Sequence, residues 1–198
     1  MNKRLILISA PPASGKNYVA KLLCDALGQV AYLDKDDLSP LLRRAFSVCG
    51  EAVDMDGDFY LNNLRRFEYE TLTALAFSAL RFSDTVVVNA PFLKEVRCAE
   101  YMRLLKKKTG DNGAELILVW IKASPEACYR RMVERNSDRD QNKLSDWDKY
   151  LKNTNFAPPL DLEASGAVDR VLIFDNESQA SATHSLEKIL KLWENKNA

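Results

Sequence analysis

The amino-acid sequence predicts an α/β protein, a three-layer sandwich in which helices cover both faces of a five-stranded parallel sheet. Three observations lead to this prediction: five short apolar runs, helical patterns between them, and a loop ending in Gly15-Lys16 directly behind the first run. Near-continuous apolar runs are typical of parallel strands, because these strands are buried on both faces. Strands that alternate with helices imply right-handed crossovers, which place helices on both sides of the sheet.

The apolar runs define the expected strands as residues 5–8, 30–33, 85–88, 116–121 and 168–174. A first helical pattern runs through residues 18–26 and ends at Gly28, which is a suitable C-cap. A second follows the stripe Leu61, Leu64, Glu68, Leu72, Leu75 and Ala79. Ser124 and Pro125 are typical of a helix start, and a last helix presents Leu186, Ile189, Leu190 and Trp193.

Length and charge limit the possible functions. A chain of 198 residues without an internal repeat or a linker predicts a single domain over residues 1–198. The formal net charge is zero, which does not favour a nucleic acid or an anionic membrane surface as partner. Four scattered cysteines, without a signal-like or membrane-spanning apolar segment, predict a reduced protein in the cytoplasm. The oligomeric state stays open.

Residues 10–17, APPASGKN, resemble the phosphate-binding P-loop GxxxxGK[ST]. The backbone N–H groups of such a loop and the N-terminus of the following helix bind phosphate. Ala10 replaces the first glycine and Asn17 replaces the hydroxyl residue that would bind Mg²⁺, whereas the Gly-Lys pair is intact. The candidate nucleotide-binding residues here are Pro12, Ala13, Ser14, Gly15, Lys16 and Asn17. The alternative is a turn that only links a strand to a helix.

Acidic and amide side chains follow the next two strands. Asp34, Asp36 and Asp37 come after the second strand, where a carboxylate could accept a proton from a hydroxyl or hold metal-bound water. The alternative for Asp36 and Asp37 is to cap a following helix. Asn89 follows the third strand as a weak metal-site candidate or a turn residue, because an amide supplies no negative charge to Mg²⁺. The candidate metal residues are therefore Asn17, Asp34 and Asn89.

Arginines follow the fourth strand. Arg131 lies in the expected helix, and Arg135 and Arg139 lie in an expected lid at about residues 135–145. Arginines stabilise the charge that spreads over a transferred phosphoryl group. The alternative is a solvated helix face with Arg–Asp pairs. Asn176 follows the fifth strand, either next to a bound nucleotide or in a simple turn.

With these residues together, the chain resembles the P-loop kinases, especially the polynucleotide 5′-hydroxyl kinases and the zeta-toxin-like AAA-type ATP-binding proteins. Asp36 lies 20 positions after Lys16, and residues 135–139 read RNSDR, like the lid of those kinases. The resemblance implies a nucleoside-monophosphate-kinase-like P-loop NTPase fold with an arginine-bearing lid. It also implies that Lys16 contacts phosphates, Asp36 is the general base, and Arg135 and Arg139 are lid arginines.

One departure concerns the acceptor. Family members commonly carry an arginine shortly after the aspartate pair, where this chain has Ser39, and Arg43 follows one helical turn later. We expect an ATP-dependent kinase that uses Mg²⁺ with atypical coordination. Its acceptor would be a hydroxyl of a small molecule or of a nucleotide or polynucleotide. Zero net charge and the acidic residues 51–58 favour a small molecule, with Arg65 and Arg66 considered for an anionic acceptor. The alternative is a nucleotide-binding regulatory module with weak or no phosphotransfer.

Overall fold

The computed structural model describes residues 3–194, without the side chains of Asp138, Arg139 and Glu194. Its sheet has five parallel strands in the order β2-β3-β1-β4-β5. The predicted α/β fold with a five-stranded parallel sheet is therefore confirmed. The strands are β1 (Lys3–Ser9), β2 (Ala31–Asp34), β3 (Thr85–Asn89), β4 (Ala114–Lys122) and β5 (Arg170–Asp175).

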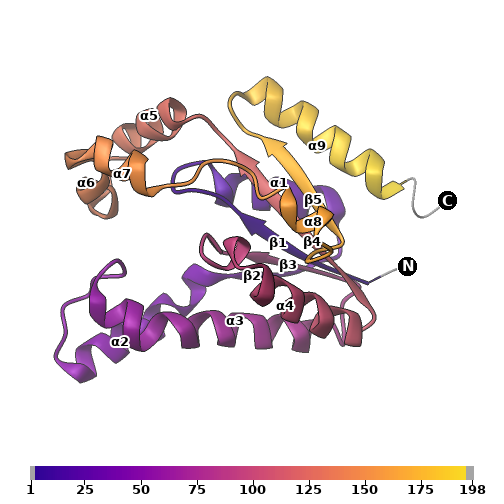
Figure 1. Cartoon of the computed structure of the whole chain (residues 1–198), viewed down its shortest axis with the longest axis horizontal. Coiled ribbons are helices and arrows are strands. Elements are labelled where there is room, and N and C mark those ends of the chain that lie inside the picture. Colours follow the sequence, from indigo (N-terminus) through magenta and orange to yellow (C-terminus); the bar gives the residue numbers. More distant parts are fainter. Residues whose placement is uncertain (1–2, 195–198) are drawn as a thin grey trace.

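Helices lie on both sides of this sheet, and shorter helices extend beyond its carboxyl edge (Figure 1). The longer helices are α1 (Lys16–Leu27), α2 (Ser39–Cys49), α3 (Arg65–Ala79), α4 (Ala99–Asp111), α5 (Pro125–Arg135) and α9 (Gln179–Glu194). The shorter ones are η1 (Lys35–Leu38), η2 (Tyr60–Leu64), η3 (Glu95–Arg97), α6 (Asp138–Ser145), α7 (Trp147–Asn153) and α8 (Asp161–Ala164). Among residues 3–194, no helix is both long and apolar enough to cross a membrane.

Strand alternation divides the core into two apolar layers. Leu5 and Leu7 of β1 pack on the face covered by α3 and α4, whereas Ile6 and Ile8 pack on the face covered by α1 and α9. All four side chains are essentially inaccessible to solvent. Burial on both faces explains why β1 reads as a continuous apolar run in the sequence.

Strand register brings the ends of the central strands together. Asn89 at the end of β3 is paired with Ile8 of β1 on one side and with Asp34 of β2 on the other. The glycine-lysine loop leaves β1 two residues after Ile8. The loop, Asp34 and Asn89 therefore meet at the carboxyl edge, where open parallel sheets bind ligands.

Three local expectations are corrected. Asp36 and Asp37 do not cap α2: they lie inside the 3₁₀ helix η1, where the Asp34 carboxylate caps the backbone N–H of Asp36 at 2.9 Å. The long stripe before β3 begins as a single π-helical segment, η2, before α3 starts. In α3 the stripe residues Glu68 and Leu72 are buried as expected, whereas Leu75 is exposed and Tyr69, outside the stripe, is buried.

Candidate functional site

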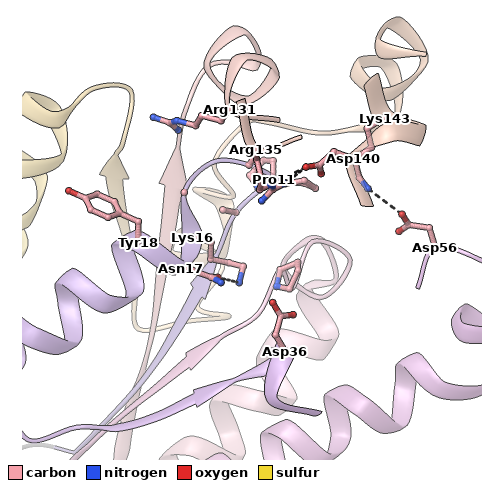
Figure 2. A pocket seen from close by; sticks show the side chains of 15 residues that line it. Pro11, Lys16, Asn17, Tyr18, Asp36, Asp56, Arg131, Arg135, Asp140 and Lys143 are labelled. Atoms are coloured by element: carbon pink, nitrogen blue, oxygen red, sulfur yellow. Dashed lines mark hydrogen bonds and ion pairs between the residues drawn. The ribbon is translucent and has the colours of Figure 1, made fainter. Parts of the chain in front are cut away.

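A cleft of about 400 Å³ lies at the carboxyl edge of the sheet (Figure 2). It is bounded by the glycine-lysine loop, by the segment after β2 and by the lid helices. Figure 2 shows the Asp36 side chain directed toward the loop, while Arg135 and Lys143 approach from the lid side. The lining residues are Ala10, Pro11, Pro12, Ala13, Gly15, Lys16, Asn17, Tyr18, Asp36, Asp56, Pro91, Arg131, Arg135, Asp140 and Lys143.

The loop owes its shape to two residues with positive φ. Ala13 has a φ of 62° and Gly15 a φ of 89°, and α1 begins immediately afterwards at Lys16. Between them the Ser14 side chain is completely buried, with its hydroxyl 3.6 Å from the Cys128 thiol. This conformation places the N-terminus of a twelve-residue helix at the cleft, which favours the binding of an anion.

The Ser14 carbonyl anchors the loop to the segment after β5. It accepts hydrogen bonds from the Asn176 side-chain amide at 2.7 Å and from the Arg131 guanidinium at 3.4 Å. Arg131 also donates to the Asn176 carbonyl at 2.6 Å. Asn176 is buried behind the loop and does not line the cleft, so its contact with a nucleotide remains a prediction.

We expect Gly15→Ala to disrupt this loop. A Cβ atom at residue 15 would lie 2.2 Å from the Asn176 amide nitrogen, and the positive φ adds strain. The free energy of unfolding should fall by about 2 kcal/mol or more, and ATP affinity should fall by about tenfold or more. Chemical denaturation and titration calorimetry would measure the two effects.

Gly28→Ala is the matched control. Gly28 also has a positive φ, of 78°, but a Cβ atom there would meet nothing within 4 Å. Backbone strain alone should lower the free energy of unfolding of this variant by roughly 1–3 kcal/mol, and its ATP affinity should be unchanged. Equal ATP affinities for the two variants would contradict a binding role for the loop.

Lys16 joins the loop to the end of β3. Its ammonium group donates to the side-chain amide oxygen of Asn89 at 2.7 Å and to that of Asn17 at 3.3 Å. The Asn89 amide group in turn donates to the Asn17 oxygen at 3.0 Å. The two asparagines that replace expected metal-associated residues are therefore in direct contact with each other and with the lysine.

Asp34 completes this cluster of polar side chains. Its carboxylate accepts hydrogen bonds from Asn89 and from the Tyr32 hydroxyl, each at 2.6 Å. Burial alone would raise the pKa of Asp34, but the hydrogen bonds from Tyr32, the Asp36 backbone and Asn89, with the charge of Lys16, lower this pKa below its ordinary value. The three predicted metal residues thus lie together around an ionised carboxylate.

Tyr32 was missed by the sequence interpretation. Its hydroxyl also accepts from the Asn89 amide at 2.8 Å, and burial together with the bond to Asp34 raises the pKa of Tyr32. Tyr32 and Asp34 are two positions apart on β2, so their side chains share one face. That spacing is the signal that could have identified Tyr32.

Two of the three predicted arginines, Arg131 of α5 and the lid arginine Arg135, lie at the cleft. Arg131 and Arg135 both line it, and Arg135 donates to the buried Asp140 carboxylate at 2.5 and 2.8 Å. This Arg–Asp pair is not the solvated pair of the alternative interpretation, because the Asp140 side chain is only 2% exposed. The Arg139 side chain lies outside the described part of the structure, so its predicted role remains a prediction.

An aromatic cluster supports the lid and was also missed. Trp147 of α7 stacks with Tyr129 and Tyr150 at ring-centroid distances of 4.9 and 5.0 Å. Trp147 and Ala13 of the loop pack against the same small apolar cluster, which contains Cys128. Burial raises the pKa of the Cys128 thiol, consistent with a structural role.

The structure thus brings most of the predicted site residues to one edge of the sheet. Pro12, Ala13, Gly15, Lys16, Asn17, Asp36, Arg131 and Arg135 line the cleft. Asp34 and Asn89 lie beneath Lys16, whereas Ser14 and Asn176 support the loop from behind. Within residues 3–194, no group of three or more His, Cys, Asp or Glu side chains could hold a metal ion. Among the predicted metal residues Asn17, Asp34 and Asn89, Asp34 is the one with a carboxylate.

Solved structures with a similar fold include kinases. A putative kinase from Chloroflexus aurantiacus aligns with a TM-score of 0.66 at 17% identity, covering 96% of this chain and 98% of that one. A gluconokinase from Sinorhizobium meliloti gives 0.56 at 18% identity, covering 100% and 99%. A shikimate kinase from Bacteroides thetaiotaomicron gives 0.54 at 13% identity, covering 96% and 98%. These likenesses establish the P-loop NTPase kinase fold.

Sequence comparison gives the family. No curated protein matches the chain, but the model of an AAA domain family matches residues 5–157. This range contains the glycine-lysine loop, Asp36, Asn89 and the lid arginines. The match confirms the resemblance to P-loop kinases, and the chain belongs to this AAA domain family of P-loop, kinase-like proteins.

Proposed function

We propose that this protein is an ATP-dependent kinase that transfers the γ-phosphoryl group to a hydroxyl group. The observation that carries the proposal is the shared cleft of Lys16, Asp36 and Arg135. A phosphate-binding lysine, a carboxylate and a lid arginine on one cavity are the groups that phosphoryl transfer requires. Binding of a nucleotide alone does not require a carboxylate directed into the cleft.

The loop and the lid would bind the nucleotide. Backbone N–H groups of residues 13–17 and the N-terminus of α1 would face the phosphates, and Lys16 would exchange its bond to Asn89 for the β- and γ-phosphates. Arg131 already contacts the loop, and Arg135 approaches from α5. Planar guanidinium groups at these positions stabilise the charge of the transferred phosphoryl group and exclude water when the lid closes.

Asp36 would act on the acceptor. Its carboxylate is exposed at the cleft, and the backbone of η1 is held by the cap from Asp34. In the proposed reaction Asp36 orients the acceptor hydroxyl and takes its proton as the oxygen attacks the γ-phosphorus. The P–O bond to ADP then breaks, and ADP leaves with the electron pair of that bond.

The residues below Lys16 fit Mg²⁺. They offer only oxygen ligands, and Mg²⁺ commonly binds through one or two carboxylates together with substrate phosphates and water. Asp34, with its lowered pKa, would supply the carboxylate, and Asn17 and Asn89 the amide oxygens. The ion would neutralise charge on the β- and γ-phosphates. Because amides replace two expected ligands, its coordination would depend mainly on the nucleotide.

A labelled-ATP transfer screen tests the proposed function. The acceptors would be nucleosides, nucleotides, sugars, sugar nucleotides and 5′-hydroxyl oligonucleotides, with Lys16→Ala as the blank. We expect transfer to at least one hydroxyl acceptor that is abolished in the blank. Transfer to none of these acceptors would contradict the kinase proposal.

Asn89→Asp would test the metal assignment. The substitution adds a second negative charge beside Asp34, so the Mg²⁺ concentration for half-maximal transfer should fall by about tenfold. A Mg²⁺ titration of the transfer rate would measure it. Asn62→Asp, on the exposed surface of η2, is the control and should leave the titration unchanged. An unchanged midpoint in Asn89→Asp would contradict a metal site at this residue.

The contacts of Asn17 and Asn89 favour a second candidate, a nucleotide-binding regulatory module. The two amides contact each other and Lys16 at the place of expected metal-associated residues. Titration calorimetry of ATP with and without Mg²⁺ separates the two candidates. Tight binding that does not depend on Mg²⁺, without transfer to any acceptor, would favour the module.

A further inference from the structure

The acceptor end of the cleft has its own charge pattern. We define this end by Asp36 and Asp56, which line the cleft on the side away from Tyr18 and Arg131 (Figure 2). Asp36 lies in η1, and Asp56 lies in the loop between α2 and η2. Within residues 3–194, Asp36 forms no ion pair. An acceptor would therefore meet carboxylate groups first.

The cation beside Asp36 is bound to a buried acid. Lys35 directs its ammonium group to the Glu68 carboxylate of α3 at 3.0 Å, and that side chain is completely inaccessible to solvent. The Tyr60 hydroxyl of η2 donates to the other Glu68 oxygen. Removing Lys35 from Glu68 would leave an unpaired buried charge, which is strongly unfavourable. Lys35 therefore stabilises the buried Glu68 carboxylate and is not available to bind an acceptor.

Two further cations, Arg65 and Lys143, also have carboxylate partners. Arg65 contacts the Glu95 carboxylate at 2.7 Å, with only 18% and 8% of the two side chains exposed. This pair corrects the expectation that Arg65 is available to an anionic acceptor. Lys143 contacts Asp56 itself at 3.3 Å and reduces its charge without reversing it.

From this pattern we infer that the acceptor is an uncharged or cationic polyhydroxyl compound, and that Asp36 and Asp56 select against carboxylate and phosphate acceptors. The inference rests on the proposed kinase function. An anionic group a few ångströms from Asp36 is repelled by the carboxylate, and Lys35, Arg65 and Lys143 already have carboxylate partners. In an environment of intermediate dielectric, this repulsion corresponds to about tenfold or more in kcat/KM. Hydroxyl groups and ammonium groups avoid this repulsion.

Matched acceptors test the inference. Gluconate, glucitol and glucamine share one carbon chain and differ only in a terminal carboxylate, hydroxymethyl or aminomethyl group. Uridine and its 3′-monophosphate form a second series with a free 5′-hydroxyl. We expect binding or Lys16-dependent transfer for the neutral or cationic member of at least one series, with kcat/KM about tenfold or more above the anionic member. Preference for the anionic members, or response to no member, overturns the inference.

Asp56→Asn tests whether Asp56 selects against anionic acceptors. It should raise kcat/KM for the anionic member by about threefold to tenfold, and it should leave ATP affinity unchanged. Glu51→Gln removes a carboxylate from the same exposed loop at a position that does not line the cleft, and it should not change the ratio between acceptors. Equal ratios in both variants would overturn the role of Asp56.

A measurement of ATP binding distinguishes failure of the inference on acceptor charge from failure of the kinase proposal. Titration calorimetry of the full chain and of Lys16→Ala with ATP reports the nucleotide site without any acceptor. If ATP binds and the anionic acceptors are preferred, the inference on charge fails while the kinase proposal stands. If ATP does not bind, the kinase proposal itself fails.

Discussion

Lys16→Ala is expected to reduce phosphoryl transfer by about 10³-fold. The substitution removes the ammonium group that, in the proposed mechanism, reaches the β- and γ-phosphates from the start of α1. It also removes the bonds from that group to Asn89 and Asn17, so the amide cluster loses its cation. Single-turnover transfer of labelled phosphate would measure the change, because it reports chemistry separately from product release.

Lys21→Ala is the matched control, because Lys21 is an exposed lysine on the same helix and does not line the cleft. We expect wild-type transfer from this variant. Comparable losses in the two variants would indicate that helix stability, rather than phosphate contact, explains the effect at Lys16. Normal transfer by Lys16→Ala would remove the lysine from the proposed mechanism.

Asp36→Asn is expected to lower kcat by about 10²- to 10⁴-fold while ATP affinity stays within about twofold. The amide keeps the size of the side chain but cannot take a proton from the acceptor hydroxyl. The backbone cap of η1 comes from Asp34, so the substitution leaves the local fold supported. Transfer kinetics and titration calorimetry measure the two quantities.

The neighbouring Asp37 provides the control for Asp36. Asp37 is also exposed within η1 but does not line the cleft. Asp37→Asn should therefore retain both transfer and ATP affinity. Unimpaired turnover of Asp36→Asn, or an equal loss at Asp37, would exclude Asp36 as the general base.

Much of the fold was predictable because the central strands β1, β3 and β4 are buried on both faces. The run Leu5–Ile8 is apolar at every position, and it and four similar, near-continuous apolar runs predicted the five strands that the structure confirms. The buried face of α3 was not predictable in the same way. A π-helical segment precedes α3, and the buried Glu68 is stabilised by Lys35 and Tyr60, which approach from other elements.

Some features of the site could likewise be predicted from the sequence, whereas others depended on the tertiary structure. The sequence by itself determined the glycine-lysine loop, its asparagine replacements and the spacing to Asp36, because these are local patterns of residue type. Only the tertiary structure decided how the charged and polar side chains are paired. It paired Arg135 with Asp140, Arg65 with Glu95 and Lys35 with Glu68, and it joined Asn17, Asn89 and Asp34 beneath Lys16. These contacts join residues from different elements, and their geometry depends on strand register and helix packing, which no local pattern records.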